Sequence, residues 1–220
     1  MAITTVDLSE VAAQLRRPFE PIEAAQVDEL GVYVYVSHGR FAWHRHLDED
    51  ELFLVLNGMV AMDSEWGSLT LHAGELVVMP KGVGHRSSSP WRAVVLLLRP
   101  KLLAHAQNGK RRLYGLAEEQ TLQKVVVGQA AASASTDFRL HPIAQVGAYS
   151  VALRRGTGHS PWEQRPVATL IMAYLGRVLV ESTDGQASLI SPKLAVVSAG
   201  TPFRLSAAGD CVCLQVGQGS

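Results

Sequence analysis

The chain has 220 residues, of which 47% are hydrophobic and 18% are charged, so it can bury a core and is not expected to be disordered. Twenty Lys and Arg balance twenty Asp and Glu, and the formal net charge of zero gives no overall attraction to nucleic acid or to an anionic membrane. The first residues lack the pattern of a secretion signal, and no apolar run is long enough to span a bilayer. The two cysteines, Cys211 and Cys213, are too close in sequence to link domains. We therefore expect a cytoplasmic protein without nucleic-acid or membrane partners.

A short helix followed by many short strands is predicted for the first half of the chain. Apolar residues such as Leu8 and Leu15 recur at helical spacing within residues 7–17, and Pro18 follows. Beyond Pro21 the sequence changes to short apolar or alternating runs with turn signals between them. The predicted strands are 31–37, 41–47, 52–56, 67–72, 75–79 and 93–99. This pattern favours a β-sandwich or a β-barrel.

The second half of the chain repeats the first. A shift of 118 positions aligns Leu52–Leu98 with Leu170–Val216 without a gap, and thirteen of the 47 pairs are identical. Composition alone would give about three identities, so the match indicates a duplicated domain. Residues 100–123, with a basic triplet and a predicted helical turn at 116–123, are interpreted as the connection. We predict one barrel with the N-terminal helix in residues 1–106 and a second barrel in residues 107–220.

Four side chains of the first copy are candidate metal ligands. His44 and His46 are two residues apart, so on an extended chain they point to the same side. Glu51 begins the next strand after an acidic turn, and His85 follows a turn that Pro80 begins. A buried unpaired Glu51 would be costly, and a divalent cation would offset that cost.

The pattern His-x-His-x4-Glu-x6-Gly, followed by Gly-x5-Pro-x-Gly-x2-His, resembles the two signature motifs of the cupin superfamily. The resemblance implies an all-β chain of two tandem jelly-roll (cupin) β-barrels, with one divalent metal bound by His44, His46, Glu51 and His85. The sequence around Glu51 is similar to small cupins that are often labelled mannose-6-phosphate isomerase-like, a label that reflects fold kinship and not an activity.

The first copy departs from the family pattern at two positions. Gly39 stands one residue nearer to His44 than in the usual motif, and Ser89 replaces the asparagine that commonly closes the second motif. Neither position is a ligand, so the implied metal site is unaffected.

The second copy lacks all four candidate ligands. The shift of 118 places Trp162, Gln164, Thr169 and Phe203 at the four ligand positions. Their joint loss indicates that the four residues act as a unit, and it predicts a metal-free second barrel. We expect Trp162 and Phe203 to fill the space of the metal.

Three imidazoles and a carboxylate suit Mn, Fe, Co, Ni, Cu or Zn better than Ca or Mg. Because each imidazole binds in its neutral form, metal binding is expected to weaken as the pH falls towards about 6.5. Phe53 and Val55 share the strand parity of Glu51 and are predicted to line an apolar pocket for a small, partly hydrophobic or aromatic molecule. Arg45 and Arg86 have the opposite parity and are expected at the solvent or at a dimer contact.

The preferred function is a metal-dependent enzyme that acts on a small-molecule substrate, of the oxygenase or of the isomerase type. The alternative is a non-catalytic small-ligand binding or sensor protein with a metal-anchored ligand, because no acid–base partner is evident in the sequence. In a further alternative the metal only braces the barrel. A homodimer is also predicted, because the run Val32–Val36 is apolar on both faces and would need cover if it formed an exposed strand edge.

Overall fold

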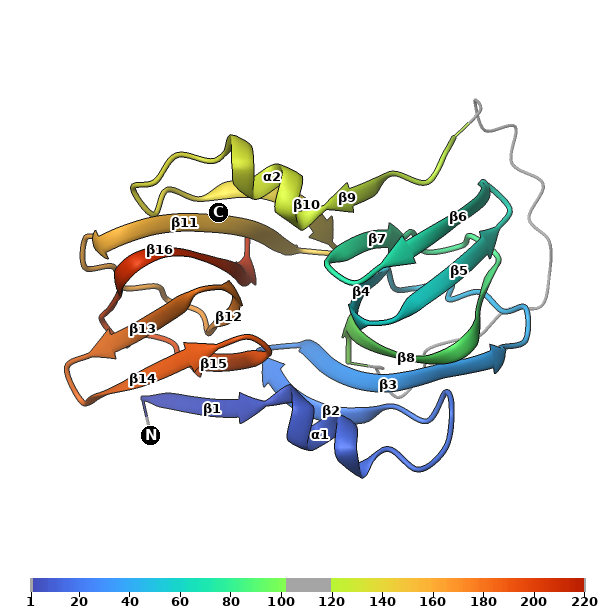
Figure 1. Ribbon diagram of the computed structural model, residues 1–220, viewed down its shortest axis with the longest axis horizontal. Helices are drawn as coiled ribbons and strands as arrows, with labels where there is room; N and C mark the ends of the chain where they lie inside the picture. Colours follow the sequence, from blue (N-terminus) through green and yellow to red (C-terminus); the bar gives the residue numbers. More distant parts are fainter. Residues whose placement is uncertain (1, 102–119, 220) are drawn as a thin grey trace. The chain divides into compact units, whose positions relative to one another are not determined.

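The computed structural model describes residues 2–101 and 120–219, which form an all-β structure of two jelly-roll barrels with two short helices (Figure 1). The strands of the first barrel's sheet are β2 (Ile22–Val27), β3 (Leu30–Arg40), β4 (Glu51–Asn57), β5 (Met59–Ser64), β6 (Gly67–His72), β7 (Glu75–Met79), β8 (His85–Pro100) and β9 (Lys124–Val126). Those of the second are β1 (Ile3–Asp7), β10 (His141–Val146), β11 (Tyr149–His159), β12 (Thr169–Leu175), β13 (Arg177–Ser182), β14 (Gly185–Ile190), β15 (Lys193–Val197) and β16 (Phe203–Gln218).

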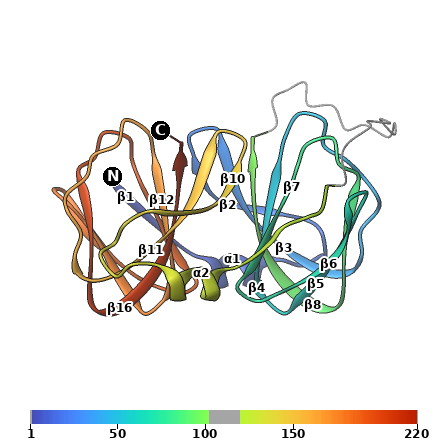
Figure 2. The same cartoon turned by 90° about the horizontal axis from the view of Figure 1, so that it is seen from above.

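The two sheets have the same topology. In the first, the strand order is β2-β3-β8-β4-β7-β9, and the hairpin β5–β6 is attached to β8. In the second, the order is β10-β11-β16-β12-β15-β1, and the hairpin β13–β14 is attached to β16. Figure 2 shows the strands of each set curving around their own interior. This correspondence confirms that the chain carries two copies of one fold.

A short helix, α1 (Leu8–Gln14), lies near the N-terminus, as the sequence predicts. It is shorter than the expected range of 7–17. The carboxylate of Asp7 accepts a hydrogen bond of 2.9 Å from the Ser9 amide, which caps the first turn. In the second copy α2 (Val127–Ser133) follows β9 as α1 follows β1. Within the described ranges, no helix has the length and apolar character needed to cross a membrane.

The first strand of each copy pairs within the sheet of the other copy. β1 is antiparallel to β15, with Thr5 opposite Ala195, and β9 is antiparallel to β7, with Val125 opposite Leu76. By contacts, 1–13, 24–28 and 127–220 form one compact unit, and 14–23 and 29–126 form the other. The N-terminal helix therefore belongs with the second barrel, which differs from its expected place in 1–106. The expected boundary between 106 and 107 lies outside the described residues.

Removal of residues 2–7 is expected to loosen β15 without affecting β7. Without β1, the backbone amides of β15 that face it would lose their hydrogen-bond partners and become exposed to water. Hydrogen–deuterium exchange of the shortened and full-length chains tests this, with β7 as the internal control. Unchanged protection at β15 would contradict the exchanged pairing.

The expected strand 41–47 is absent. This segment is a loop with isolated bridges at His44 and His46. The two imidazoles still lie side by side, with their ring centroids 5.1 Å apart. The predicted helical turn at 116–123 lies mostly outside the described residues, and residues 120–123 have no helical structure.

The run Val32–Val36 is not an edge. It lies in β3, which pairs with β2 on one side and with β8 on the other. Val32 and Val34 are fully buried in the barrel. The argument from this strand to a homodimer is therefore wrong, although the dimer itself stays a prediction.

Two pairs of glycines keep corresponding turns in both copies. Gly58 and Gly176 have φ values of 82° and 70°, in the left-handed region that L side chains rarely adopt. A Cβ atom at Gly176 would lie 2.6 Å from the carbonyl oxygen of Asp210, so no larger residue fits there without a shift of the backbone. Gly39 and Gly158, also at positive φ, adjoin the register shifts of β3 and β11.

Candidate metal centre

Three parts of the first barrel bring the four candidate ligands together. The backbone of His44 pairs with that of His85 in both directions, with N···O distances of 3.0 and 2.8 Å, so the loop is fixed against the start of β8. The His46 carbonyl accepts a 2.6 Å hydrogen bond from the amide of Gly82, in the turn before β8. Glu51 begins β4, whose register places it opposite Met79 of β7.

One donor atom from each of His44, His46, Glu51 and His85 lies within 4.8 Å of the other three. The Nε2 atoms of His46 and His85 are 3.3 and 3.2 Å from Oε2 of Glu51. For metal–ligand bonds of about 2.1 Å, adjacent donors of an octahedral or tetrahedral site are about 3.0 to 3.4 Å apart. The distances therefore match a shared ion.

The opposite ring nitrogen, Nδ1, of each histidine faces an oxygen atom, which leaves Nε2 for a metal. Nδ1 of His44 is 3.0 Å from the carbonyl oxygen of Ala42, and Nδ1 of His85 is 3.0 Å from that of Val83. Nδ1 of His46 is 3.0 Å from Oε1 of Glu49, an ion-pair contact and not a well-directed hydrogen bond. A carbonyl or carboxylate beside Nδ1 favours the tautomer with its proton there, so the Nε2 lone pair is available to a metal.

Burial and neighbouring charges shift the pKa values of the site in different directions. Burial, together with His85, lowers the pKa of His44 below its ordinary value. Burial also acts to lower the pKa of His46, but Glu49 and Glu51 outweigh it, and the net shift is upward. Burial raises the pKa of Glu51, but His85, His46 and Arg99 outweigh that effect, and the carboxyl titrates below its usual range. The carboxylate is thus ionised and able to bind a cation.

Two donor atoms of the cluster have no other role in the fold. Oε2 of Glu51 and Nε2 of His85 are buried and have no hydrogen-bond partner in the part of the chain that the structure describes. Leaving such atoms unsatisfied is costly, and a cation between them would remove the cost. The residues present therefore fit a divalent transition metal with three imidazole ligands and one carboxylate ligand.

The cluster opens onto a cavity of about 400 Å³ with largely aromatic walls. Besides the four candidate ligands, its lining consists of Phe19, Pro21, Tyr35, Phe41, Ala42, Phe53, Ser87, Leu97 and Arg99. Phe53 is thus placed where the parity argument expects it. Val55 is 1% exposed and packs in the hydrophobic core of the barrel, one pleat further from the cluster. The cavity suits a small, flat, mostly apolar molecule.

Sequence reasoning missed a second layer around the cluster. Glu49 is 6% exposed although it lies in what reads as a solvated acidic turn. Arg99, near the end of β8, has Nη1 3.4 Å from Oε1 of Glu51 and 4.0 Å from Oε1 of Glu49. No local signal identifies this network, because Arg99 is 50 residues from Glu49 and reaches it only through the β4–β8 pairing.

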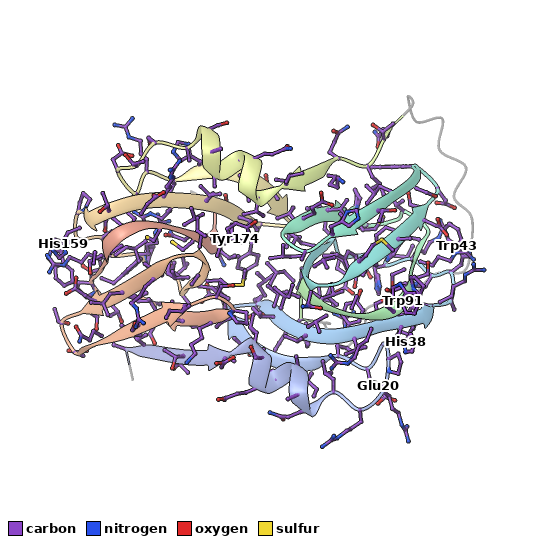
Figure 3. All side chains as sticks on the ribbon, in the orientation of Figure 1. Glu20, His38, Trp43, Trp91, His159 and Tyr174 are labelled. Carbon is purple, nitrogen blue, oxygen red and sulfur yellow. The ribbon has the colours of Figure 1, made fainter. Side chains whose placement is uncertain are left out.

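Neither arginine near the ligands in sequence lines the cavity. Arg45 was expected at the surface, but it is 5% exposed and donates a 2.8 Å hydrogen bond to Oε1 of Glu65. Its burial reflects the loop, which is not a strand with alternating faces. Arg86 pairs with Asp63 and covers the ring of Trp43, which Figure 3 labels at the periphery of the first barrel.

Replacement of Glu49 by glutamine is expected to lower the metal affinity about 10- to 100-fold, as loss of an outer partner of a ligating histidine does elsewhere. The amide is nearly isosteric but carries no charge to hold the Nδ1 proton of His46. Competition with a chelator measures the affinity. The exposed neighbour Asp48 supplies a matched control, Asp48→Asn, which should leave it within about twofold. Equal affinities of wild type and Glu49→Gln would remove this role.

The second barrel places different residues at the ligand positions than a fixed shift of 118 suggests. The backbone of Glu163 pairs with Phe203 as His44 pairs with His85, with N···O distances of 2.8 Å in both directions. The Arg165 carbonyl accepts a hydrogen bond from Gly200, as that of His46 does from Gly82. Glu163 and Arg165, not Trp162 and Gln164, are therefore the counterparts of His44 and His46. The loop between β11 and β12 is one residue shorter than that between β3 and β4, which moves the alignment by one position.

Trp162 does not fill the space of a metal. It is 51% exposed, and its ring is covered by Arg204 at 5.0 Å, the same arrangement as Trp43 with Arg86. Phe203 is 1% exposed and packs in the core of the second barrel, and Thr169 is equally buried. The absence of a metal from this barrel stays a prediction.

Comparison with known proteins agrees with this fold. The cupin domain family matches residues 31–97. An uncharacterized protein YdbB of Bacillus subtilis (strain 168) is 31% identical over 96 residues, which are 43% of this chain and 85% of that protein. The chain belongs to the cupin superfamily.

Solved structures extend the likeness of fold to nearly the whole chain. Salicylate 1,2-dioxygenase from Pseudaminobacter salicylatoxidans has a TM-score of 0.79 at 9% identity, over 97% of this chain and 83% of that one. A cupin 2 conserved barrel domain protein from Leptotrichia buccalis has a TM-score of 0.74 at 7% identity, over 98% and 96%. At these identities the similarity concerns the fold alone.

Proposed function

We propose that this bicupin is a metal-dependent enzyme of the oxygenase type, with one divalent transition metal held by His44, His46, Glu51 and His85. The observation that carries the proposal is the convergence of these four donors beside an aromatic-walled cavity of about 400 Å³. Four protein ligands leave one or two positions of a five- or six-coordinate metal free for small molecules. When bound, a redox-active metal would supply oxygen chemistry beside a chelated substrate.

The chain's own residues would orient the substrate and exclude water. Phe19, Phe41 and Phe53 line the cavity and can contact the faces and edges of a flat ring. Arg99 lies beside the outer oxygen of Glu51 and would hold the carboxylate in place. Such walls favour a small aromatic or enolic molecule over a sugar phosphate.

The titratable groups of the cavity favour an oxygenase over an isomerase. An isomerase needs a positioned base to move a proton. Apart from the four ligands, Tyr35 and Arg99 are the titratable side chains in the described lining. Burial raises the pKa of Tyr35, so its hydroxyl stays protonated and is a poor base at neutral pH.

The second candidate is a non-catalytic binding or sensor protein with a metal-anchored ligand. The same shortage of acid–base groups favours it, because binding alone needs none. It differs from the enzyme in one measurable respect, which is turnover. In the further alternative the metal only braces the barrel, and the cavity would then bind no small molecule.

Oxygen consumption by the metal-loaded chain tests the proposal. Iron, copper and nickel forms would be screened against catechols, diketones, flavonols, salicylate and gentisate; the last two are named with the structural neighbour. We expect substrate-dependent oxygen uptake with a ring- or chain-cleaved product, and none in His85→Ala. Saturable binding without uptake would favour the sensor, and an isomerised product would favour the isomerase.

We also propose a homodimer in the cytoplasm. β6 pairs with β5 alone among the described strands, so its other edge is available to a second chain. A monomer by light scattering at micromolar concentration would remove the dimer. The absence of nucleic-acid and membrane partners stays a prediction.

A further inference from the structure

The second barrel holds a network of charged and polar side chains at the position of the first barrel's metal centre. Nη1 of Arg154 donates to Oε1 of Glu163, and to Oε1 of Gln215 at 2.8 Å. Nε of Arg154 donates to the carbonyl oxygen of Phe138 at 2.6 Å. Arg165 holds the other oxygen of Glu163 with a 3.1 Å hydrogen bond from its Nε. The guanidinium of Arg154 thus provides a fixed cation where the first barrel offers donors to a metal.

This network is more than a replacement core. The side chain of Arg154 is 8% exposed, and Gln215 is 3% exposed. Apolar side chains of similar size at these buried positions would stabilise the barrel as well or better. Two guanidinium groups also face a single carboxylate, so the network carries one surplus positive charge. The side chain of Arg165 is 27% exposed, so the surplus positive charge lies where a ligand of the opposite charge can reach it.

A cavity of about 340 Å³ lies against this network, within the second barrel's own compact unit. Arg165 is the one charged residue in its described lining, and Gln215 and Ser150 add polar groups. Gly217 also lines it, at the strand position that carries Arg99 in the first barrel. The change from arginine to glycine leaves room for a small molecule beside the guanidinium of Arg165.

We propose that the second barrel binds a small molecule with a carboxylate, without a metal, in this cavity. The planar guanidinium of Arg165 pairs with the carboxylate, and Gln215 contributes an amide to the polar wall. One surplus positive charge matches a monoanion better than a phosphate dianion. Leu140, Pro142 and Ala152 offer an apolar side for the remainder of the molecule.

A titration of the full chain that is monitored by NMR amide shifts tests the proposal. The probes are sodium acetate, sodium benzoate and inorganic phosphate. We expect saturable shifts around β11 and β16 with a carboxylate, and affinity at least about tenfold lower in Arg165→Gln. The variant Gly217→Leu is chosen to fill the cavity: a Cβ atom at this position would meet no atom closer than 3.6 Å, and Gly217 lines the cavity. It should abolish the shifts while the melting temperature stays near that of wild type.

The first barrel provides the control. His85→Ala removes a proposed metal ligand in the other barrel and should leave carboxylate binding at β11 and β16 unchanged. Saturation by phosphate and not by the carboxylates would overturn the assignment of ligand class. The site itself is overturned if none of the three probes saturates at millimolar concentration. It is equally overturned if Gly217→Leu binds like wild type.

Discussion

A chain with His85→Ala is expected to lose more than about 100-fold in metal affinity, because loss of an outer partner alone costs 10- to 100-fold. The imidazole of His85 is 2% exposed and its Nε2 lies 3.2 Å from Glu51, so no solvent group can easily take its place. Metal titrations of wild type and variant by calorimetry, from the same metal-free preparation, measure the difference.

The same variant separates metal binding from folding. Metal that binds only the native state raises stability by about 4 kcal/mol at a free concentration 1,000 times its dissociation constant. We therefore expect added metal to raise the melting temperature of wild type and not of His85→Ala. His38→Ala is the matched control, because His38 is an exposed histidine of the same barrel. A variant that still takes up one equivalent with wild-type affinity would contradict the proposed ligand set.

Glu163→Ala is expected to destabilise the second barrel by about 3 kcal/mol, because it leaves the buried charge of Arg154 without its partner. The double variant Arg154→Met with Glu163→Leu should recover most of that loss, since it removes both charges together. Urea unfolding followed by circular dichroism measures both changes.

The matched control lies in the first barrel. Asp63 pairs with Arg86 at 2.9 Å, but both side chains are partly exposed, so Asp63→Ala should cost no more than about 1 kcal/mol. Equal costs for Glu163→Ala and Asp63→Ala would show that the network of the second barrel is not buried in solution.

The candidate ligands could be predicted because their residue types recur at short, local spacings that are typical of metal sites. His44 and His46 are two residues apart, and the turn from Pro80 to His85 has fixed glycines. The strands also follow from local patterns: 67–72 and 75–79 agree with β6 and β7 residue for residue. The ligand spacing and the strand pattern can both be recognised without knowledge of the tertiary structure.

Other features depend on contacts between distant parts of the chain. The pairing of β1 with β15 joins residues that are 186 to 194 positions apart, and no local pattern indicates it. The burial of Glu49 needs Arg99 from a different strand. The gapless alignment of the two copies begins at Leu52 and does not include the loop before it, where the copies differ in length by one residue. The predicted place of Trp162 is therefore wrong.

We propose that three imidazoles and one carboxylate of the first barrel hold one metal ion. A crystal structure of the metal-loaded chain, with anomalous scattering recorded at the absorption edge of that metal, tests it most directly. We expect one anomalous peak per chain, in contact with the Nε2 atoms of His44, His46 and His85 and with Glu51. A peak elsewhere, or no peak from crystals of a chain loaded to one equivalent, would contradict it.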